Sequence, residues 1–576
     1  MKELMLGNKA LARGLYEAGC CFISAYPGTP STEVTEEAAR FPEIYCEWAP
    51  NEKVAMETAY GASLAGKRSA CVMKHVGVNV AADPLYTMSY TGINAGLVIV
   101  VSDDPGMHSS QNEQDSRRHA IAAKVPMLEP ADSAEAVEMV KEAYRLSEEY
   151  DTPVMVKLCT RVSHGQSVVE TGERTVPIKE YVKDIPKYVM VPDNARPRHP
   201  IVEARTEKLK AYAETTPLNR AEMGDTKLGI ITHSTSYQYV KEVMGESCSV
   251  LKLGMTNPLP DGLIRDFASK VDRLVVVEEL EPVIEEHCKA MGLAVTGKED
   301  FTLIGEYSQT LLARVLKGEE RPYVQVDEAV PVRPPVMCAG CPHRGIFYTL
   351  AKHNVTVLGD IGCYTLAAGA PLHAIEMCLC MGASIGAVHG YNKALGKAGE
   401  EKTVAILGDS TFMHSGMTGL ADIAYNQSNS TVVILDNSTT GMTGHQQNPT
   451  TGFNLRGEPA GRIDLEALCR AMGIRRVVVV DPYDLDQCEK AVTEELAAPE
   501  PSVIIARRPC TLLKSVKHQP PVKVITDSCK GCKSCMKIGC PAISMREKKA
   551  VIDPTQCTGC GVCVQMCQFE AMEQEV

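Results

Sequence analysis

Short apolar runs alternate with helix-like segments along most of the chain. In residues 1–180 the apolar runs have the length of strands, and they are Cys20–Ala25, Ser69–Met73, Leu97–Ser102 and Pro153–Leu158. This alternation predicts βα units around a parallel sheet. Residues 1–19 have the spacing of an amphipathic helix and contain no apolar signal-peptide segment. We therefore expect an α/β domain over residues 1–183.

The alternation is interrupted twice. A stretch rich in Pro, Arg and Lys, residues 184–226, predicts a linker that carries an exposed helix, and residues 320–335 predict a second linker. Between them, residues 227–319 predict a smaller α/β domain. Residues 336–515 predict a doubly wound parallel sheet, with strands at Leu358–Cys363, Val404–Asp409, Val432–Asn437, Arg476–Asp481 and Val503–Pro509. Ligands of such sheets bind outside the carboxyl ends of the strands.

Length, composition and net charge argue against several classes of protein. A chain of 576 residues is too long for one hydrophobic core, and 44% hydrophobic with 23% charged residues is a globular composition. A net charge of −13 argues against nucleic acid or an anionic membrane as the main partner. The apolar runs are far shorter than a membrane span. We expect a cytoplasmic protein.

The last unit, residues 520–576, is rich in cysteine. Two C-x2-C-x2-C loops are each followed by a further cysteine. Each loop can wrap one [4Fe–4S] cluster, whose fourth ligand is the remote cysteine of the other loop. One cluster is then expected on Cys529, Cys532, Cys535 and Cys567, and the other on Cys557, Cys560, Cys563 and Cys540. The pattern resembles the bacterial two-cluster ferredoxins, although Gln568 replaces the usual proline and the first loop has one extra residue. The alternative is a pair of zinc ribbons, whose C-x2-C pairs usually lie farther apart.

Two strand ends in residues 336–515 carry oxygen ligands. Gly408, Asp409 and Ser410 end one predicted strand, and Asn437 ends the next. A helix that begins near Thr411 would direct free N–H groups at a diphosphate, and hard cations such as Mg²⁺ prefer oxygen ligands. The pattern resembles the thiamine-diphosphate motif, with Ser410 in place of its second glycine. The resemblance implies that Asp409, Asn437 and the carbonyl of Thr439 bind Mg²⁺, and that Gly362 also approaches the cofactor. The alternative is an ordinary nucleotide-fold turn.

The amino-terminal domain carries a candidate activating carboxylate. Residues 25–31, AYPGTPS, follow a strand and resemble the Tyr-Pro-x-Thr-Pro-Ser loop of 2-oxoacid:ferredoxin oxidoreductases. The resemblance implies that Glu52 binds the thiamine pyrimidine ring and that Thr29 lies near the substrate's carbonyl group. Lys74, His75 and Asn79 follow the next strand as candidate pocket residues. Without the resemblance, Glu52 is a helix-start carboxylate, Thr29 a capping residue and His75 a structural histidine.

Four more cysteines fall at the predicted carboxyl edge of the sheet in residues 336–515. They are Cys338, Cys341, Cys363 and Cys510. In pyruvate:ferredoxin oxidoreductase relatives a proximal [4Fe–4S] cluster uses such a set, which implies a third cluster here. The alternative is that they are buried cysteines acting as small hydrophobes.

Together these motifs cover almost the whole chain. CAGCPHRG, DIGCYTL, GDSTFMHSG and LDNSTTGMTG, with the cysteine-rich tail, resemble the large subunit of indolepyruvate:ferredoxin oxidoreductases. The resemblance implies two doubly wound thiamine-binding domains, a small domain between them that is similar to the transketolase C-terminal domain, and a ferredoxin domain. It also implies oxidative decarboxylation of arylpyruvates to arylacetyl-CoA, a smaller beta subunit, a dimer of heterodimers and ferredoxin as electron acceptor.

Three alternatives to this function stay open. The chain has only one Trp and eight Phe, and its sequence does not show what shapes the substrate pocket, so the same chemistry on another 2-oxoacid is one alternative. A non-redox thiamine lyase or decarboxylase is the second, and it would form product without CoA or an electron acceptor. The third is an electron-transfer scaffold subunit, which would bind iron but no thiamine diphosphate.

Overall fold

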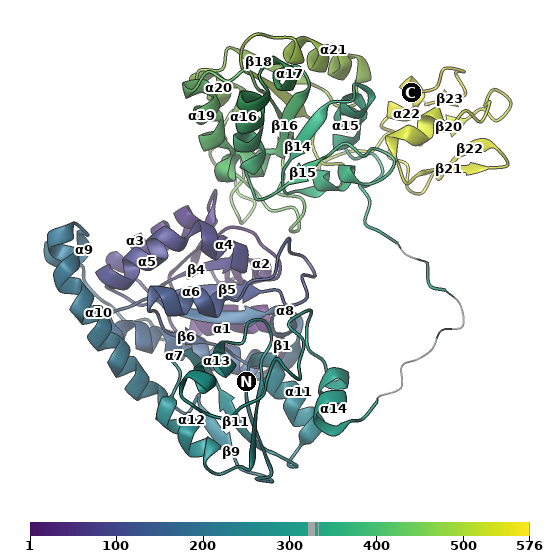
Figure 1. Cartoon of the computed structure of the whole chain (residues 1–576). Coiled ribbons are helices and arrows are strands. Elements are labelled where there is room, and N and C mark those ends of the chain that lie inside the picture. The colour runs from purple at the N-terminus through teal and green to yellow at the C-terminus, as the bar shows by residue number, and fades with distance from the viewer. Residues whose placement is uncertain (321–325, 327–328, 332, 575–576) are drawn as a thin grey trace. The chain divides into compact units, whose positions relative to one another are not determined.

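The computed structural model describes residues 1–320, 326, 329–331 and 333–574. The chain forms two compact units, residues 1–327 and 328–576 (Figure 1). Half of the expected second linker, residues 320–335, lies outside the described residues. No helix among the described residues is both long and apolar enough to cross a membrane.

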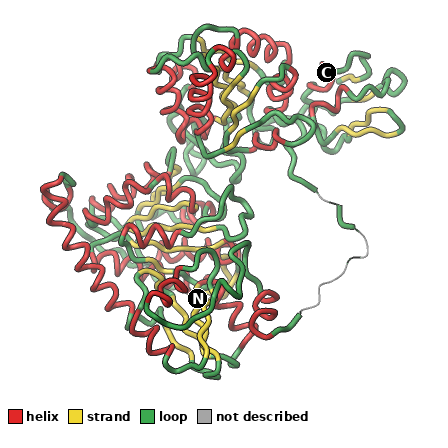
Figure 2. The backbone as a smooth tube through the Cα atoms, in the orientation of Figure 1, coloured by secondary structure: helices red, strands yellow, loops and turns green. Residues whose placement is uncertain are grey.

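The first unit is built on a seven-stranded sheet with the strand order β12-β6-β7-β5-β4-β2-β3. Its strands are β2 (Phe22–Ala25), β3 (Tyr45–Trp48), β4 (Ser69–Lys74), β5 (Leu97–Asp103), β6 (Met127–Leu128), β7 (Val154–Cys159) and β12 (Met255–Asn257). All but β12 run parallel. Every residue of β4, β5 and β7 is buried, because helices cover both faces of the sheet (Figure 2). These helices are α1 (Gly7–Glu17), α2 (Thr32–Ala38), α3 (Glu52–Leu64), α4 (His75–Val80), α5 (Ala82–Thr91), α6 (Ser116–Ala123), α7 (Ser133–Tyr150) and α8 (Thr160–His164).

The amino terminus corrects one expectation. The predicted helix over residues 1–19 is present only as α1, and it is preceded by strand β1 (Lys2–Leu6). This strand pairs antiparallel with β8 (Gln166–Glu170). The pairing partner lies more than 150 residues away in sequence, so local periodicity does not reveal it.

A second sheet of the first unit has the order β13-β10-β11-β9. It contains β9 (Arg220–Glu222), β10 (Leu228–His233), β11 (Ser249–Leu253) and β13 (Arg273–Val277), with α11 (Ser234–Met244), α12 (Asp261–Ala268), α13 (Val283–Ala290) and α14 (Gln309–Lys317). This small domain gives β12 to the first sheet, where it pairs with β6. The two domains are therefore joined by a shared sheet edge.

The segment 184–226 is more ordered than a linker. It contains α9 (Ile185–Tyr188), the 22-residue α10 (Pro192–Ala213) and β9. Helix α10 buries Val202, Arg205 and Leu209. Its two internal prolines, Pro197 and Pro200, lie beyond its first turn, so each removes one backbone hydrogen bond from the helix.

The second unit is built on a six-stranded parallel sheet with the order β15-β14-β16-β17-β19-β18. Its strands are β14 (Thr356–Gly359), β15 (Met377–Cys378), β16 (Thr403–Gly408), β17 (Thr431–Asp436), β18 (Arg476–Val480) and β19 (Ser502–Arg507). The helices are α15 (His343–Lys352), α16 (Ala383–Leu395), α17 (Lys397–Glu400), α18 (Asp409–Thr411), α19 (Met417–Tyr425), α20 (Leu465–Ala471) and α21 (Leu485–Leu496). Strand β14 ends at Gly359, so Cys363 lies beyond the strand and begins a 3-10 turn over Cys363–Ala368.

The cysteine-rich segment forms a small domain at the end of the second unit. Two short antiparallel pairs frame it: β20 (Lys523–Val524) with β23 (Met572–Glu573), from the two ends of the domain, and the hairpin of β21 (Ile543–Arg546) with β22 (Lys549–Ile552). A 3-10 turn over Ser534–Ile538 and the helix α22 (Val562–Gln565) follow the two cysteine loops. Its core includes three of the eight cysteines, Cys529, Cys535 and Cys563, together with Val522, Ile538 and Met566 among others, and four further cysteines pack against it.

Candidate functional site

Glu52 is buried at the amino terminus of α3 in the first unit. It is 6% exposed. Asn51 caps the helix, accepting a hydrogen bond from the backbone N–H of Val54 at 2.9 Å. Gly77 in α4 lies against Glu52, since a Cβ atom on Gly77 would be 2.7 Å from Glu52 Oε1. Glycine at position 77 therefore makes room for this carboxylate.

Lys74 and His75 lie at the end of β4 near the loop that carries Thr29. Lys74 is 7% exposed, and Nζ donates to the carbonyl of Ser109 at 2.6 Å. It forms no ion pair with any described residue, and burial lowers its pKa to about 8. A Cβ atom on Gly28 would be 3.0 Å from Lys74 Cβ, so the loop packs on the lysine stem. Thr29 itself is half-buried.

His75 is buried with one ring nitrogen lacking a described partner. Nε2 lies 3.3 Å from the carbonyl of Asn112, whereas Nδ1 has no hydrogen bond to a described residue. Burial, and then the neighbouring Lys74, lower the pKa of His75 to about 4. Asn79 instead lies at the surface, where its side-chain oxygen is 3.1 Å from the ring of His119. The structure thus groups Glu52, Lys74 and His75 along one sheet edge and places Asn79 outside.

Asp409 begins α18 directly after β16 in the second unit. It is 1% exposed, and it accepts hydrogen bonds from the N–H of Ser410 at 2.7 Å and from Thr450 Oγ1 at 3.3 Å. No described cation lies within ion-pair distance of the carboxylate. Burial, and then the charge of Asp436, raise the pKa of Asp409 to about 7. A buried carboxylate in these surroundings has lost its water without gaining a positive partner.

Asn448 and Thr450 belong to this site, and the motif search did not identify them. Asn448 Oδ1 accepts from Thr450 Oγ1 at 2.7 Å, while Asn448 Nδ2 is buried without a described partner. Both come from a polar loop after β17 with no repeat or spacing that would have singled them out. Asn437 is 8% exposed, and its carbonyl accepts from the N–H of Cys510 at 2.9 Å. Thr439 is buried nearby, with Oγ1 3.4 Å from the carbonyl of Gln446.

The loops after β14, β16 and β17 are hydrogen-bonded to one another. Thr411 Oγ1 donates to the carbonyl of Ile361 at 3.2 Å, and Thr440 Oγ1 donates to Ser410 Oγ at 2.9 Å. Gly362 is in close contact with the Tyr364 ring, because a Cβ atom at Gly362 would be 2.3 Å from it. The predicted residues Gly362, Ser410 and Thr411 therefore lie at one edge of the sheet.

Asp360 also lies at this edge of the sheet, although no sequence motif identified it. It is fully buried, and it accepts hydrogen bonds from the N–H groups of Gly382 at 2.9 Å and Ser384 at 3.1 Å. It thereby joins the loop after β14 to the amino terminus of α16. Like Asp409, Asp360 directly follows an apolar strand, and this position in the sequence could have identified it as a candidate site residue.

The four cysteines proposed for a proximal cluster lie within electrostatic range of one another. Burial, and then the Cys338 and Cys510 thiols among others, raise the pKa of Cys341 to about 12. Burial and then Cys510 and Cys338 raise the pKa of Cys363. A Cβ atom on Gly441 would be 3.5 Å from Cys363 Sγ and 3.9 Å from Asn437 Nδ2. The cysteine set therefore adjoins the oxygen ligands of the loop after β17.

Two cavities in the second unit are lined by the two cysteine sets predicted for the ferredoxin domain. One is lined by Cys529, Cys532, Cys535 and Cys567. The other is lined by Cys540, Cys557, Cys560 and Cys563. Within the described part of the chain, no three His, Cys, Asp or Glu side chains are grouped as ligands of a single metal ion.

The second of these cavities also contacts the CAGC loop. Gly340, Cys341 and Arg344 line it. A Cβ atom on Gly340 would be 1.9 Å from Thr558 Oγ1, so glycine allows the two cysteine loops to meet. Arg344 Nη1 donates to the carbonyl of Ile538 at 3.0 Å, which fixes this contact.

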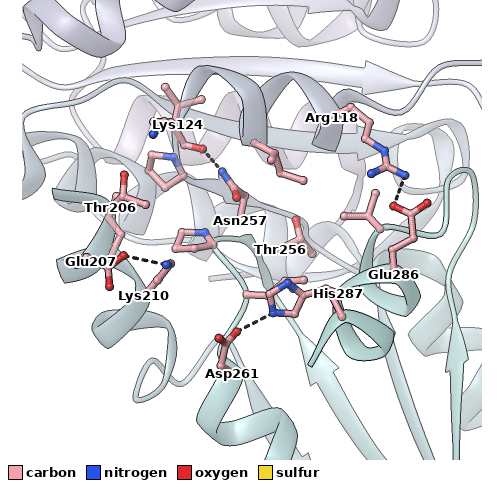
Figure 3. Close-up of a pocket in the computed structure, with 18 of the residues that line it drawn as sticks. Arg118, Lys124, Thr206, Glu207, Lys210, Thr256, Asn257, Asp261, Glu286 and His287 are labelled. Carbon is pink, nitrogen blue, oxygen red and sulfur yellow. Dashed lines mark hydrogen bonds and ion pairs between the residues drawn. The ribbon is translucent and has the colours of Figure 1, made fainter. Parts of the chain in front are cut away.

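A separate cavity of about 560 Å³ lies in the first unit between α6, α10, β12 and α13 (Figure 3). Its charged side chains pair with one another: Arg118 lies 2.7 Å from Glu286, and His287 lies 2.6 Å from Asp261. Three of the lining residues of the cavity, Lys124, Val125 and Pro126, directly precede β6, so the cavity lies at the opposite end of that strand from the Glu52 edge. None of the predicted site residues lines this cavity.

Family models cover three parts of the chain. Residues 13–226 match "Pyruvate flavodoxin/ferredoxin oxidoreductase, thiamine diP-bdg", and residues 360–506 match "Thiamine pyrophosphate enzyme, C-terminal TPP binding domain". Residues 521–568 match "4Fe-4S dicluster domain". Thiamine diphosphate and a domain for two [4Fe–4S] clusters, both expected from the motifs, are therefore confirmed. The chain is a thiamine-dependent 2-oxoacid:ferredoxin oxidoreductase.

Similar proteins are found over the whole length. Indolepyruvate oxidoreductase subunit IorA of Pyrococcus horikoshii is 42% identical, and the match covers 100% of this chain and 97% of that protein. The subunits of the same name from Archaeoglobus fulgidus and Methanothermobacter marburgensis are 39% and 38% identical, each over 99% of this chain and 97% of their own length. The chain belongs to the family of indolepyruvate oxidoreductase IorA subunits.

Proposed function

We propose that this chain, with a smaller beta subunit, converts arylpyruvates of the indolepyruvate type into arylacetyl-CoA. One 2-oxoacid anion, one CoA thiol and two oxidised ferredoxins give one acyl-CoA, one CO₂, one proton and two reduced ferredoxins. The substrate follows the names of relatives up to 42% identical. A dimer of heterodimers is the assembly that we propose.

The observation that carries the redox function is the contact between the CAGC loop and the ferredoxin domain. Gly340 lies against Thr558, and the hydroxyl of Tyr483 donates to the carbonyl of Gly340. This contact connects the edge that carries Asp409 with the cysteine-lined cavities. A thiamine lyase has no use for such a connection, which disfavours that alternative.

We assign Asp409, Asn437 and the carbonyl of Thr439 to Mg²⁺ and the diphosphate, with Asn448 and Thr450 beside them. The cation-free buried carboxylate and the unpartnered Asn448 amide fit such a group. Bound thiamine diphosphate supplies a carbanion-stabilising thiazolium that allows loss of CO₂. Asp409 holds the metal, and the first turn of α18 directs its N–H groups toward phosphate oxygens.

In the first unit we assign Glu52 to the pyrimidine nitrogen and Lys74 to the substrate's carboxylate. A carboxylate that hydrogen-bonds this nitrogen lets the cofactor activate itself. Lys74 is a buried ammonium whose described hydrogen-bond partner is a carbonyl, and among the described residues no anion lies within ion-pair distance, although the charge of Asp104 is felt from farther away. Thr29 is placed near the carbonyl group of the substrate, and His75 stays neutral above about pH 5 as a cofactor contact.

Substrate and chemistry are tested together by dye reduction. The complex, purified without oxygen, is given CoA, a viologen dye and either indolepyruvate, phenylpyruvate, pyruvate or 2-oxoglutarate. We expect reduction with the aryl acids that is lost when thiamine diphosphate is withheld. Reduction with the small acids alone would overturn the substrate, and none with any acid, in an iron-loaded complex, would favour the scaffold alternative.

Glu52→Ala tests the catalytic assignment. We expect turnover to be abolished with iron content unchanged, because the variant loses cofactor activation but no cysteine. Glu57→Ala is the matched control, since Glu57 lies on the same helix at the surface and pairs with Lys53. Full activity of Glu52→Ala would remove Glu52 from the site.

The third cluster is a proposal of its own. Cys510→Ser is expected to lower bound iron by about one [4Fe–4S] equivalent while both ferredoxin-domain clusters remain. Cys469→Ala, at a buried cysteine outside every proposed set, serves as control. Unchanged iron in Cys510→Ser would exclude Cys510 from the proximal set.

A further inference from the structure

The two cysteine cavities of the second unit have different surroundings. The cavity of Cys540, Cys557, Cys560 and Cys563 contacts the CAGC loop through Gly340, Cys341 and Arg344. The cavity of Cys529, Cys532, Cys535 and Cys567 is lined by ferredoxin-domain residues alone. On the proposed function, electrons released near Asp409 would enter at the first cavity and leave from the second.

The second cavity lies directly below the surface. Cys532 is exposed. Phe569, which lines the same cavity, is 43% exposed, and Ile525, which precedes the Cys529 loop, is 38% exposed. A small apolar centre beside a redox site is the arrangement of a protein interface.

Positive charge surrounds this exit. Residues 529–549 contain six cationic side chains and one acidic one, Glu547, although the whole chain carries −13. Five of the cations are exposed, and Lys549 is half-buried. We define the exit face as Cys532, Phe569, Lys530, Lys533, Lys537, Arg546 and Lys548.

Local packing brings the charges of the exit face together. Lys530 and Lys533 flank Cys532 and line the cavity. A Cβ atom on Gly531 would be 2.2 Å from the carbonyl of Lys548, so the turn that carries Arg546 and Lys548 packs on the Cys532 loop. Lys549 Nζ donates to the carbonyl of Cys529 at 2.6 Å.

These cations are not neutralised within the unit. None of the five exposed ones forms an ion pair within 4.0 Å with a described residue, whereas many surface cations of the chain do, such as Lys53 with Glu57. Cations that have no described ion-pair partner and outnumber the nearby exposed acids Asp527, Glu547 and Glu570 attract an oppositely charged surface and raise its association rate.

We propose that the exit face is the docking site of a small acidic iron–sulfur protein that accepts one electron at a time. The inference rests on the proposed function and adds to it the place and the charge of the acceptor. One electron passes from the reduced cluster below Cys532 to the oxidised carrier, which then leaves. A second carrier takes the second electron of the turnover.

The test uses the complete iron-loaded complex. Lys537→Glu/Arg546→Glu reverses two charges of the exit face without changing a residue that lines the cluster cavity. Lys402→Glu/Arg475→Glu is the matched control, because both residues are exposed and directly precede β16 and β18, at the opposite edge of the sheet from Asp409. The two double variants have the same net charge.

Rate constants for reduction of a purified acidic [4Fe–4S] ferredoxin are measured by stopped flow at rising ionic strength. We expect the exit-face variant to be roughly tenfold slower at low salt and to lose most of the salt dependence. Methyl viologen reduction stays at the wild-type rate, and cytochrome c, a basic acceptor, is reduced no more slowly. The control variant reduces ferredoxin like the wild type.

Three results would overturn the docking site. They are an unchanged ferredoxin rate in the exit-face variant, an equal loss in both double variants, and release of the beta subunit from the exit-face variant, which would make this face the subunit interface. Failure of the wild-type complex to reduce even viologen would instead refute the proposed function.

Discussion

Two groups of buried charge in the first unit have opposite character. One, the buried ion network, consists of Asp103, Asp115, Arg117, Glu129, Lys157, His233 and Glu278. Arg117 lies 2.6 Å from both Asp115 and Glu278, and Lys157 lies 2.8 Å from Glu129. In the other group, the Glu52 site, Lys74 has only a backbone carbonyl and His75 Nδ1 has no described partner. The network is thus paired among its own charges, whereas the Glu52 site keeps buried polar atoms that a ligand can satisfy.

The buried ion network joins residues of two domains. Arg117 and Asp115 come from the first sheet's domain, whereas His233 and Glu278 come from the small domain. The network therefore fixes two domains to each other. Thr256 in β12 adds to it, because its hydroxyl donates to Glu129 at 2.6 Å. Glu52, Lys74 and His75 all come from the first sheet's domain.

The largest effect is expected for Arg117→Met. Removing this guanidinium leaves Asp115 and Glu278 buried without their cation, which typically costs 3–5 kcal/mol. Urea unfolding of the complex, followed by circular dichroism, measures the loss. A loss below about 1 kcal/mol would mean that the network does not hold the domains together.

The pH dependence of stability distinguishes Lys74 from Lys157. The folded-state pKa of Lys74 is about 8, below its ordinary value of 10.5. Burying the charged ammonium destabilises the folded state. This cost is absent above pH 10.5 and grows as the pH falls to about 8, so the folded state is more stable at the higher pH. The difference amounts to about 3 kcal/mol. Lys74→Met should remove this pH dependence and be more stable than the wild type at pH 7.

Paired Lys157 should behave in the opposite way. Its carboxylate partners raise its pKa, so Lys157→Met is expected to lower the unfolding free energy at pH 7. Thermal unfolding of both variants across this pH range makes the comparison. Destabilisation of equal size in both would contradict the distinction between paired and unpaired lysines.

A smaller effect is expected on substrate binding. Lys74→Met should raise KM for the 2-oxoacid roughly tenfold, because a hydrogen bond to a charged group contributes about 1.5–3 kcal/mol. Thiamine diphosphate content should stay unchanged. Lys74→Arg should recover part of the affinity, whereas a purely structural lysine would show no rescue in KM.

The smallest effect on stability is expected for a substitution at a surface ion pair. Arg118 pairs with Glu286 at 2.7 Å, but both side chains are about half exposed. Arg118→Met should change stability by no more than about 1 kcal/mol. It is the control for its neighbour Arg117, and a loss as large as that of Arg117→Met would show that burial is not what separates the two.

Sequence patterns predicted the carboxyl ends of the parallel strands well, because buried strands of this kind are continuous apolar runs. β16 and β17 end within one residue of the positions expected, so Asp409 and Asn437 were placed correctly at the sheet edge. Features that depend on distant pairing were missed. β1 was assigned to a helix, and β12, which comes from the small domain, was not foreseen in the first sheet.

Site residues were likewise predicted where local spacing identifies them, and were missed where only the folded chain brings them together. Cysteine spacing predicted both sets that line the ferredoxin-domain cavities. Asn448 and Thr450 were not predicted, because a polar loop has no periodicity and these side chains reach Asp409 only through the folded path of that loop. Lys74 was recognised as a candidate, but only its burial without an anion distinguishes it from Lys157.

The close contact of Gly340 with Thr558 has a kinetic consequence. Because the ferredoxin domain is part of the same chain, its effective concentration at the CAGC loop is set by the tether and not by the cell. On the proposed electron route, the first hop is therefore independent of carrier supply. Only the last hop, at the proposed docking site, responds to it, so electrons would accumulate on the enzyme when acceptors are scarce.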